Sequence, residues 1–218
     1  NKYMSFKKFF YKLNNKKKYQ NLKSELIKNQ RIKILKSGFE KKIIDIQEKL
    51  QKNEISFLHS GHLGDIINAL PVLKELSNNH KCNLYLQVEK PLEKHIRGYK
   101  HEGDEIYMSE KMVNMVLPLL KNQDYINKVE KYNGQLVDVD LNLFRKIPMN
   151  FNLDEVRWYF HLTGIHTDLS KQYLFANEHP SIKNKIVIMR STRRKNMFIN
   201  YKFMTKYKDI LFLGLNDE

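Results

Sequence analysis

Hydrophobic and polar positions along this chain follow two different periods, and the clearest change lies between residues 55 and 76. Ile55, Phe57 and Leu58 form a short apolar run, which is typical of a buried strand. From residue 66 apolar side chains return about every three residues, which predicts an amphipathic helix. A turn with two glycines separates these elements, and Asp65 stands where the helix pattern starts. The pattern predicts a strand, a turn and a helix in succession.

The alternation of strand and helix patterns continues along the chain. Further strands are expected at residues 83–88, 105–108, 136–141 and 210–213, and further helices at residues 112–120 and from 203 to the turn at 208–209. Strands and helices that take turns indicate the α/β class with a mostly parallel sheet. We expect three parts: a basic helical extension over residues 1–54, an α/β domain over 55–180, and the incomplete start of a second domain over 181–218.

The turn before Asp65 has two interpretations. Gly61 and Gly64 are expected to let the backbone adopt positive φ and lie close to a ligand, since neither has a Cβ. A carboxylate in this place would face the crevice at the carboxyl ends of the strands, where α/β proteins bind ligands. Alternatively, Asp65 only caps the helix. The sequence of this turn matches neither a Walker phosphate loop nor a dinucleotide-binding fingerprint.

Charge is concentrated at the N-terminus. The chain has a net charge of +15, and residues 1–54 carry 16 Lys or Arg against 5 Asp or Glu, which leaves a net of +4 for the rest. Apolar residues spaced by three or four between Ile32 and Leu50 predict an amphipathic helix, which Gly38 is expected to kink. Three uses stay open for this extension: packing on its own domain, docking on an anionic membrane surface, or binding nucleic acid.

Other classes of protein find little support. The apolar runs are far shorter than the roughly 20 residues of a transmembrane helix, no secretory signal is recognisable, and Cys82 is the sole cysteine, so no intrachain disulfide forms. We therefore expect a cytoplasmic protein, and a peripheral place on the inner face of a membrane stays open.

Candidate metal ligands are also sparse. Asp138 and Asp140 share one face of the strand expected at 136–141, but two carboxylates without a third ligand favour no metal. The eight histidines form no zinc motif, although His59 and His62 flank the key turn and either is placed to contact a substrate or to pack. Ser60 does not stand in a nucleophile elbow, which argues against a serine hydrolase.

The segment GHLGDIINALPVLKEL, with the strand before it, resembles the opening motif of the heptosyltransferase-like glycosyltransferases, glycosyltransferase family nine. In that family a strand, an LGD turn and an ALP helix begin the first Rossmann-like domain of a GT-B fold. LDEVRWYFHLTGI is similar to the helix and Gly turn that close this domain, and NKIVIMRSTRRKN is similar to the first strand and loop of the second Rossmann-like domain. The resemblance covers about residues 55–218 and implies that the second domain is truncated here.

The resemblance implies an inverting glycosyltransferase that needs no metal and no cofactor. Its partners would be a nucleotide-diphosphate sugar as donor and a glycan or lipid-linked acceptor in polysaccharide biosynthesis, with Asp65 as general base. On the acceptor side we expect Gly61, His62, Gly64, Asn142 and Arg145 to contact substrate. The donor phosphates would meet Arg190, Ser191, Thr192, Arg193 and Lys195, with Arg194 as an alternative cation.

A second hypothesis involves no catalysis. The chain would be a Rossmann-like binding module whose basic extension holds an anionic partner. We expect activity of the full-length enzyme rather than of this fragment alone, and we do not expect nucleic acid as a partner.

Overall fold

The computed structural model describes residues 9–35, 38–92, 106–146, 154–189 and 199–213. The chain divides into two compact units, residues 1–175 and residues 176–218. The first unit is an α/β domain with a parallel sheet, as the alternating pattern predicted.

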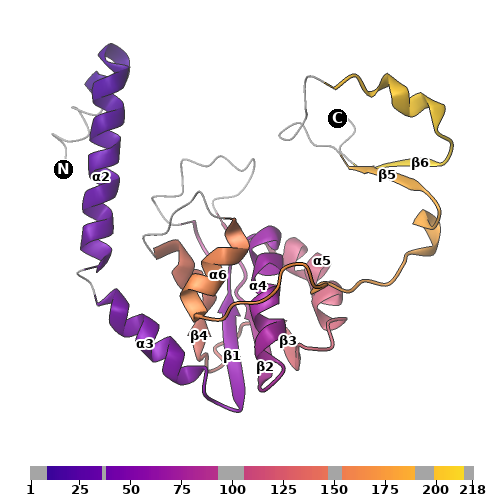
Figure 1. Ribbon diagram of the computed structural model, residues 1–218, viewed down its shortest axis with the longest axis horizontal. Coiled ribbons are helices and arrows are strands. Elements are labelled where there is room, and N and C mark those ends of the chain that lie inside the picture. The colour runs from indigo at the N-terminus through magenta and orange to yellow at the C-terminus, as the bar shows by residue number, and fades with distance from the viewer. Residues whose placement is uncertain (1–8, 36–37, 93–105, 147–153, 190–198, 214–218) are drawn as a thin grey trace. The chain divides into compact units, whose positions relative to one another are not determined.

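The sheet of the first unit contains four parallel strands: β1 (Glu54–His59), β2 (Lys81–Leu86), β3 (Lys128–Lys131) and β4 (Val139–Asp140). Their order across the sheet is β3-β2-β1-β4 (Figure 1). The chain therefore moves outward from β1 to β3 and then returns to the other side of β1. This is the order in which doubly wound sheets begin, and it creates a topological switch point between β1 and β4.

Helices with one apolar face cover this sheet. α4 (Leu63–Leu76) follows β1, α5 (Glu110–Lys121) precedes β3, and α6 (Glu155–Thr163) follows the 3₁₀ helix η1 (Leu141–Lys146). α4 and α6 lie side by side, and a hydrogen bond of 2.8 Å from Asn68 Nδ2 to Glu155 Oε2 links them (Figure 1). The fully buried side chains include Ile55, Phe57, Ile66, Leu70, Leu73, Leu84, Leu86, Leu120, Leu141, Tyr159 and Leu162.

α6 ends as its sequence predicts. Asp154 caps its first turn by accepting a hydrogen bond from Arg157 N at 3.2 Å, and Gly164 ends the helix with φ of 70°. That left-handed conformation favours glycine, and a Cβ would also lie 2.7 Å from Gln47 Nε2. The helix and the Gly turn expected over residues 153–165 are therefore present where the structure describes them.

The N-terminal extension divides at Gly38. Gly38 has φ of 78° and separates α2 (Lys16–Leu35) from α3 (Phe39–Lys49), so one helix ends there and another begins. α3 packs on the domain through Ile46 and Leu50, which are 3% exposed. Of the α2 side chains that the structure describes, none is buried. Only the second half of the predicted amphipathic segment therefore packs on the core. No described helix is long and apolar enough to cross a membrane.

One predicted strand is wrong. Of the segment 105–108, Ile106 makes only an isolated antiparallel bridge with Pro91, and Tyr107 N–H donates to Lys90 O at 3.0 Å, so this stretch pairs with the chain that leaves β2. The third strand is β3 instead, whose sequence KVEK has Val129 as its one buried residue. The second strand begins two residues before the predicted position 83.

The second unit contains a small parallel sheet of β5 (Ile186–Met189) and β6 (Ile210–Leu213), with η2 (Pro180–Ile182) and η4 (Tyr201–Lys206) beside them in sequence. The strand at 210–213 is confirmed, and Asp209 has φ of 59° in the predicted turn before it. No side chain of this unit is buried within the residues that the structure describes.

Candidate functional site

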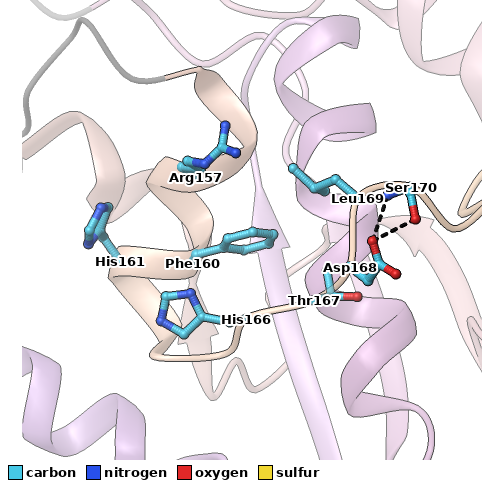
Figure 2. A pocket seen from close by; sticks show the side chains of 8 residues that line it. All are labelled: Arg157, Phe160, His161, His166, Thr167, Asp168, Leu169 and Ser170. Atoms are coloured by element: carbon cyan, nitrogen blue, oxygen red, sulfur yellow. Dashed lines mark hydrogen bonds between the residues drawn. The ribbon is translucent and has the colours of Figure 1, made fainter.

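One hollow among the described residues lies beside α6 and has a volume of about 530 Å³ (Figure 2). Charged groups at its edge already have partners: Asp168 accepts hydrogen bonds from Ser170 N and Oγ at 2.9 and 2.7 Å, and Arg157 pairs with Asp154. None of the residues that line it was predicted as a site residue. Its lining residues are Arg157, Phe160, His161, His166, Thr167, Asp168, Leu169 and Ser170.

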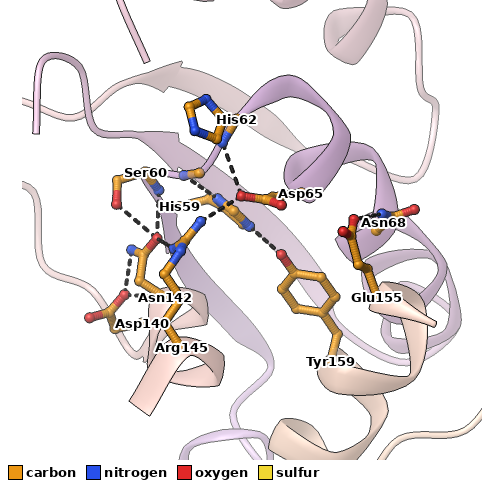
Figure 3. Close-up of polar contacts among 11 residues, drawn as sticks. His59, Ser60, His62, Asp65, Asn68, Asp140, Asn142, Arg145, Glu155 and Tyr159 are labelled. Atoms are coloured by element: carbon orange, nitrogen blue, oxygen red, sulfur yellow. Dashed lines mark hydrogen bonds and ion pairs between the residues drawn. The ribbon is translucent and has the colours of Figure 1, made fainter. Parts of the chain in front are cut away.

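A different place, at the switch point, gathers the polar side chains that the sequence singled out (Figure 3). β1 and β4 pair in parallel, with Phe57 opposite Val139 and Leu58 opposite Asp140. The residues that follow the two strands therefore emerge at the same edge of the sheet. In α/β proteins this edge, at the reversal of strand order, is the usual place for a ligand.

Asp65 and Arg145 form an ion pair across this switch point. Arg145 Nη2 lies 2.6 Å from Asp65 Oδ2, and the two side chains are 7% and 18% exposed. The same Oδ2 accepts a hydrogen bond from His62 N–H at 3.1 Å, so Asp65 also caps α4. Within the described part of the chain, Oδ1 receives no hydrogen bond. The carboxylate thus has one oxygen fixed and one left for another group.

Arg145 is held on several sides. Its Cζ atom lies 4.4 Å from the ring centroids of both Tyr107 and Phe144, a distance at which cation–π attraction operates. Its Nη1 donates to Asn142 Oδ1 at 3.0 Å. A guanidinium that is 7% exposed, paired and stacked in this way has little freedom to move.

Asn142 connects Arg145 to the turn after β1. Its Oδ1 also accepts from Ser60 N at 2.9 Å and from Ser60 Oγ at 2.8 Å, and its Nδ2 donates to Asp140 Oδ1 at 2.6 Å. Asn142 N–H donates to that same carboxylate oxygen at 3.0 Å. Ser60 and Asn142 are both buried, so this amide fixes the distance between the two strand ends.

Asp138 and Asp140 have separate partners. Asp138 pairs with Lys52 and accepts from Ser56 N–H at 3.0 Å, whereas Asp140 holds Asn142. Partial burial alone would raise the pKa of Asp138, but the hydrogen bonds from Lys52 and Ser56 outweigh burial and lower it. Among the described residues, no three His, Cys, Asp or Glu side chains are grouped as a metal site would need.

His59 is the last residue of β1 and is fully buried. Gly61 N–H donates to its Nδ1 at 2.8 Å, which places the ring proton on Nε2, and Nε2 lies 2.8 Å from Tyr159 Oη. Burial, followed by the positive charges of Arg145 and Lys90, lowers the pKa of His59 well below its usual value. His59 is therefore neutral at neutral pH and acts as a hydrogen-bond acceptor for the turn.

Three consecutive backbone N–H groups of the turn are thus bound by side chains. Ser60 N–H donates to Asn142, Gly61 N–H to His59, and His62 N–H to Asp65. In phosphate-binding turns such groups point at the ligand instead. This turn presents a carboxylate at the switch point, not a cradle of N–H donors.

Gly61 is required for space rather than for backbone conformation. A Cβ built on Gly61 would lie 2.5 Å from Asp65 Oδ2, 2.5 Å from His59 Cε1 and 2.6 Å from Arg145 Nη2. Gly64 is the second residue of α4 and has nothing within 4 Å of such a Cβ. Neither glycine has the predicted positive φ. Among the described glycines, positive φ occurs at Gly38, Gly134 and Gly164. That expectation was wrong.

The remaining predicted site residues are placed as follows. His62 precedes α4, and its ring centroid lies 5.9 Å from that of Tyr107. The predicted donor-phosphate residues lie outside the described residues: Arg190, Ser191, Thr192, Arg193, Arg194 and Lys195.

Sequence reasoning missed the parts of the site that His59 and Tyr159 supply. For His59 the sequence left contact with a substrate and packing both open, and it indicated no place in the site for Tyr159. A usable signal existed for His59, because it closes an otherwise apolar strand and so lies at the carboxyl end of the sheet. Nothing in the sequence distinguishes Tyr159 from its aromatic neighbours.

Comparison of the whole chain with models of protein families, with curated proteins and with solved structures finds no match.

The two glycines provide a matched test of the packing around Asp65. Gly61→Ala is expected to destabilise the domain by about 1–3 kcal/mol, because the methyl group overpacks three converging side chains. Gly64→Ala is expected to be neutral or stabilising, since alanine favours a helix and meets open space. Urea unfolding of both variants measures the difference. Equal stability of the two variants would contradict the close packing at Gly61.

The buried ion pair is tested by a double-mutant cycle. Asp65→Asn and Arg145→Met are each expected to cost about 3–5 kcal/mol, because each leaves a buried partner unpaired. The double variant is expected to lose at least about 1 kcal/mol less than the sum. The exposed pair Lys128–Glu130 serves as control, since a surface pair is expected to show no measurable coupling. Strict additivity at Asp65 and Arg145 would show that the pair contributes nothing.

His59 is expected to make stability depend on pH. The unfolded chain binds a proton near pH 6.5 and the folded chain only at lower pH, so the free energy of unfolding should fall by about 1.4 kcal/mol per pH unit below about pH 6.5. The contribution is fully present above that pH. Denaturant unfolding between about pH 7.5 and pH 5 measures it, and His59→Gln should reduce the slope by this amount. An unchanged slope in that variant would assign the pH dependence to other groups.

Proposed function

We propose that this chain is part of an inverting, metal-independent glycosyltransferase of the GT-B type, resembling glycosyltransferase family nine, in which Asp65 is the general base. The acceptor hydroxyl oxygen forms a bond to the anomeric carbon of a nucleotide-diphosphate sugar. Its proton passes to Asp65, and the bond between the sugar and the diphosphate breaks. The nucleoside diphosphate leaves with the electron pair.

The observation that carries this proposal is the position of Asp65. Its carboxylate stands at the switch point between β1 and β4, where α/β domains bind ligands, and it retains an unbonded oxygen within the described structure. In glycosyltransferase family nine, which this segment resembles, the expected base is the Asp of the LGD turn, and Asp65 is the Asp of this turn.

The hydrogen bonds of the turn support an acceptor-side role. Because the N–H groups of Ser60, Gly61 and His62 are bound by side chains, the turn does not offer them to a phosphate. A sugar hydroxyl that attacks, in contrast, needs a proton acceptor, which a carboxylate oxygen can supply. In the proposal Asp65 Oδ1 takes that proton while Arg145 keeps Oδ2 in place.

The donor side of the proposal belongs to the second unit. β5 and β6 are parallel, as the start of a second Rossmann-like domain would be, and the basic segment 190–195 follows β5 directly. Ser191, Thr192 and a neighbouring cation would stabilise the charge that develops on the departing diphosphate.

One observation favours the non-catalytic alternative. Asp65 already caps α4 and neutralises a buried guanidinium, so its structural role is complete without any substrate. In a binding module this ion pair would only hold the two strand ends together. The two functions differ in whether loss of the carboxylate stops turnover or merely lowers stability.

Asp65→Asn separates the two functions when it is compared with Asp138→Asn. Both carboxylates are partly buried, 18% and 17% exposed, and both pair with a cation, so both substitutions lower stability. Transfer from UDP-, GDP- and ADP-linked sugars to glycan acceptors is followed as release of nucleoside diphosphate by the full-length protein. We expect Asp65→Asn to reduce kcat by about 10²- to 10⁴-fold and Asp138→Asn to leave it within a few-fold.

Donor binding is measured in parallel as the rise in melting temperature that a saturating nucleotide sugar produces. Asp65→Asn is expected to keep this rise while it loses turnover, because the base does not bind the donor. Turnover that persists in folded Asp65→Asn removes Asp65 from the role of base. A wild-type protein that no nucleotide sugar stabilises favours the binding module.

A further inference from the structure

Large apolar side chains are exposed near the N-terminus. Residues 9–14 are helical, and Phe9, Phe10 and Leu13 on this segment are 62%, 53% and 68% exposed. Asn15 then accepts a hydrogen bond from Lys18 N–H at 2.9 Å and so caps the start of α2. Two neighbouring phenylalanines left in water are unusual, because most exposed apolar side chains stand singly.

Lysines surround these apolar residues. Lys12 and Lys16–Lys18 lie within nine residues of Phe9 and Phe10, Lys23 and Lys28 follow along α2, and all six side chains are exposed. Glu25 is the one acidic residue between positions 9 and 29, so the segment carries a net charge of +5. We name residues 9–29 the basic aromatic segment.

The basic aromatic segment does not pack as α3 does. α3 buries Ile46 and Leu50 in the core, whereas no side chain of residues 9–29 is buried. The segment also contributes none of the hydrogen bonds that build the switch-point network. Its apolar and basic side chains are therefore available to another surface.

We infer that the basic aromatic segment docks on the surface of an anionic lipid bilayer. Phe9, Phe10 and Leu13 would enter the boundary between headgroups and acyl chains, while the adjacent lysines bind lipid phosphates. Each Lys near an anionic membrane contributes about 1 kcal/mol, and no single contribution suffices for stable binding. One short segment thus combines apolar side chains with lysines. A bilayer surface accommodates both, because it is apolar at its acyl chains and charged at its headgroups.

Duplex nucleic acid would bind the lysines of this segment but not its exposed apolar side chains. Its phosphates would bind the lysines, but exposed phenylalanine side chains find no apolar surface along a duplex backbone. The inference is independent of the proposed transfer reaction, since it depends on residues outside the switch point.

The test is co-sedimentation of the full chain with vesicles of phosphatidylcholine, with or without about one third phosphatidylserine. We expect binding only to the anionic vesicles, weakened as salt rises from about 0.1 M to about 0.5 M. The triple variant K16Q/K17Q/K18Q is expected to bind about a hundredfold more weakly, because three contributions of about 1 kcal/mol are lost and 1.4 kcal/mol is tenfold. F9S/F10S is expected to lose about tenfold or more with its charge unchanged.

The matched control is K81Q/K111Q/K121Q, which removes the same charge from exposed lysines of β2 and α5. It is expected to keep wild-type affinity for the anionic vesicles. Equal weakening by this control, or unchanged binding of F9S/F10S, overturns the inference, because either result means unspecific attraction by net charge. Tighter binding to duplex RNA than to vesicles, lost in K16Q/K17Q/K18Q, overturns it in favour of nucleic acid.

Discussion

The ion pair between Asp65 and Arg145 is the constraint on which the rest of the first unit's polar structure depends. It joins side chains 80 residues apart in sequence, one from the first turn of α4 and one from η1 after β4. A guanidinium that is only 7% exposed must be paired and hydrogen-bonded, since an unpaired buried charge is very costly. Asn142 and the rings of Tyr107 and Phe144 contact this cation, and a Cβ at Gly61 would collide with the pair.

The backbone of the turn after β1 follows from the same constraint. Each of its three N–H groups finds a side-chain acceptor, and each acceptor is fixed by another part of the network: Asn142 by Asp140, His59 by Tyr159 and Asp65 by Arg145. His59 accepts the hydrogen bond from Gly61 N–H only while its ring is neutral, so protonation of His59 would break that bond. The turn therefore depends both on the ion pair at Asp65 and on an uncharged His59. Side chains rather than these three N–H groups are therefore what the turn can offer to a ligand.

Periodicity predicted the elements near the site better than the order of the sheet. The strand, turn and helix around Asp65 were evident, and the position of Asn142 and Arg145 after another parallel strand correctly placed them at the same edge. β3 was not predicted because KVEK offers one apolar residue, and β4 occupies only two residues of the strand expected at 136–141. The role of Gly61 was not predictable, since its need for space arises from three side chains, those of His59, Asp65 and Arg145, that only the folded structure brings together.

The geometry of the ion pair also limits what Asp65 can do chemically. Oδ2 accepts from both Arg145 and His62 N–H, and freeing it would leave a buried guanidinium unpaired. The pair must therefore persist while any substrate is bound, and a proton can be received only at Oδ1. In the proposed reaction a carboxylate fixed in this way is already oriented before the substrate arrives, so no free energy is spent on orienting it. The same rigidity that makes Asp65 resemble a simple helix cap is what a general base at the switch point requires.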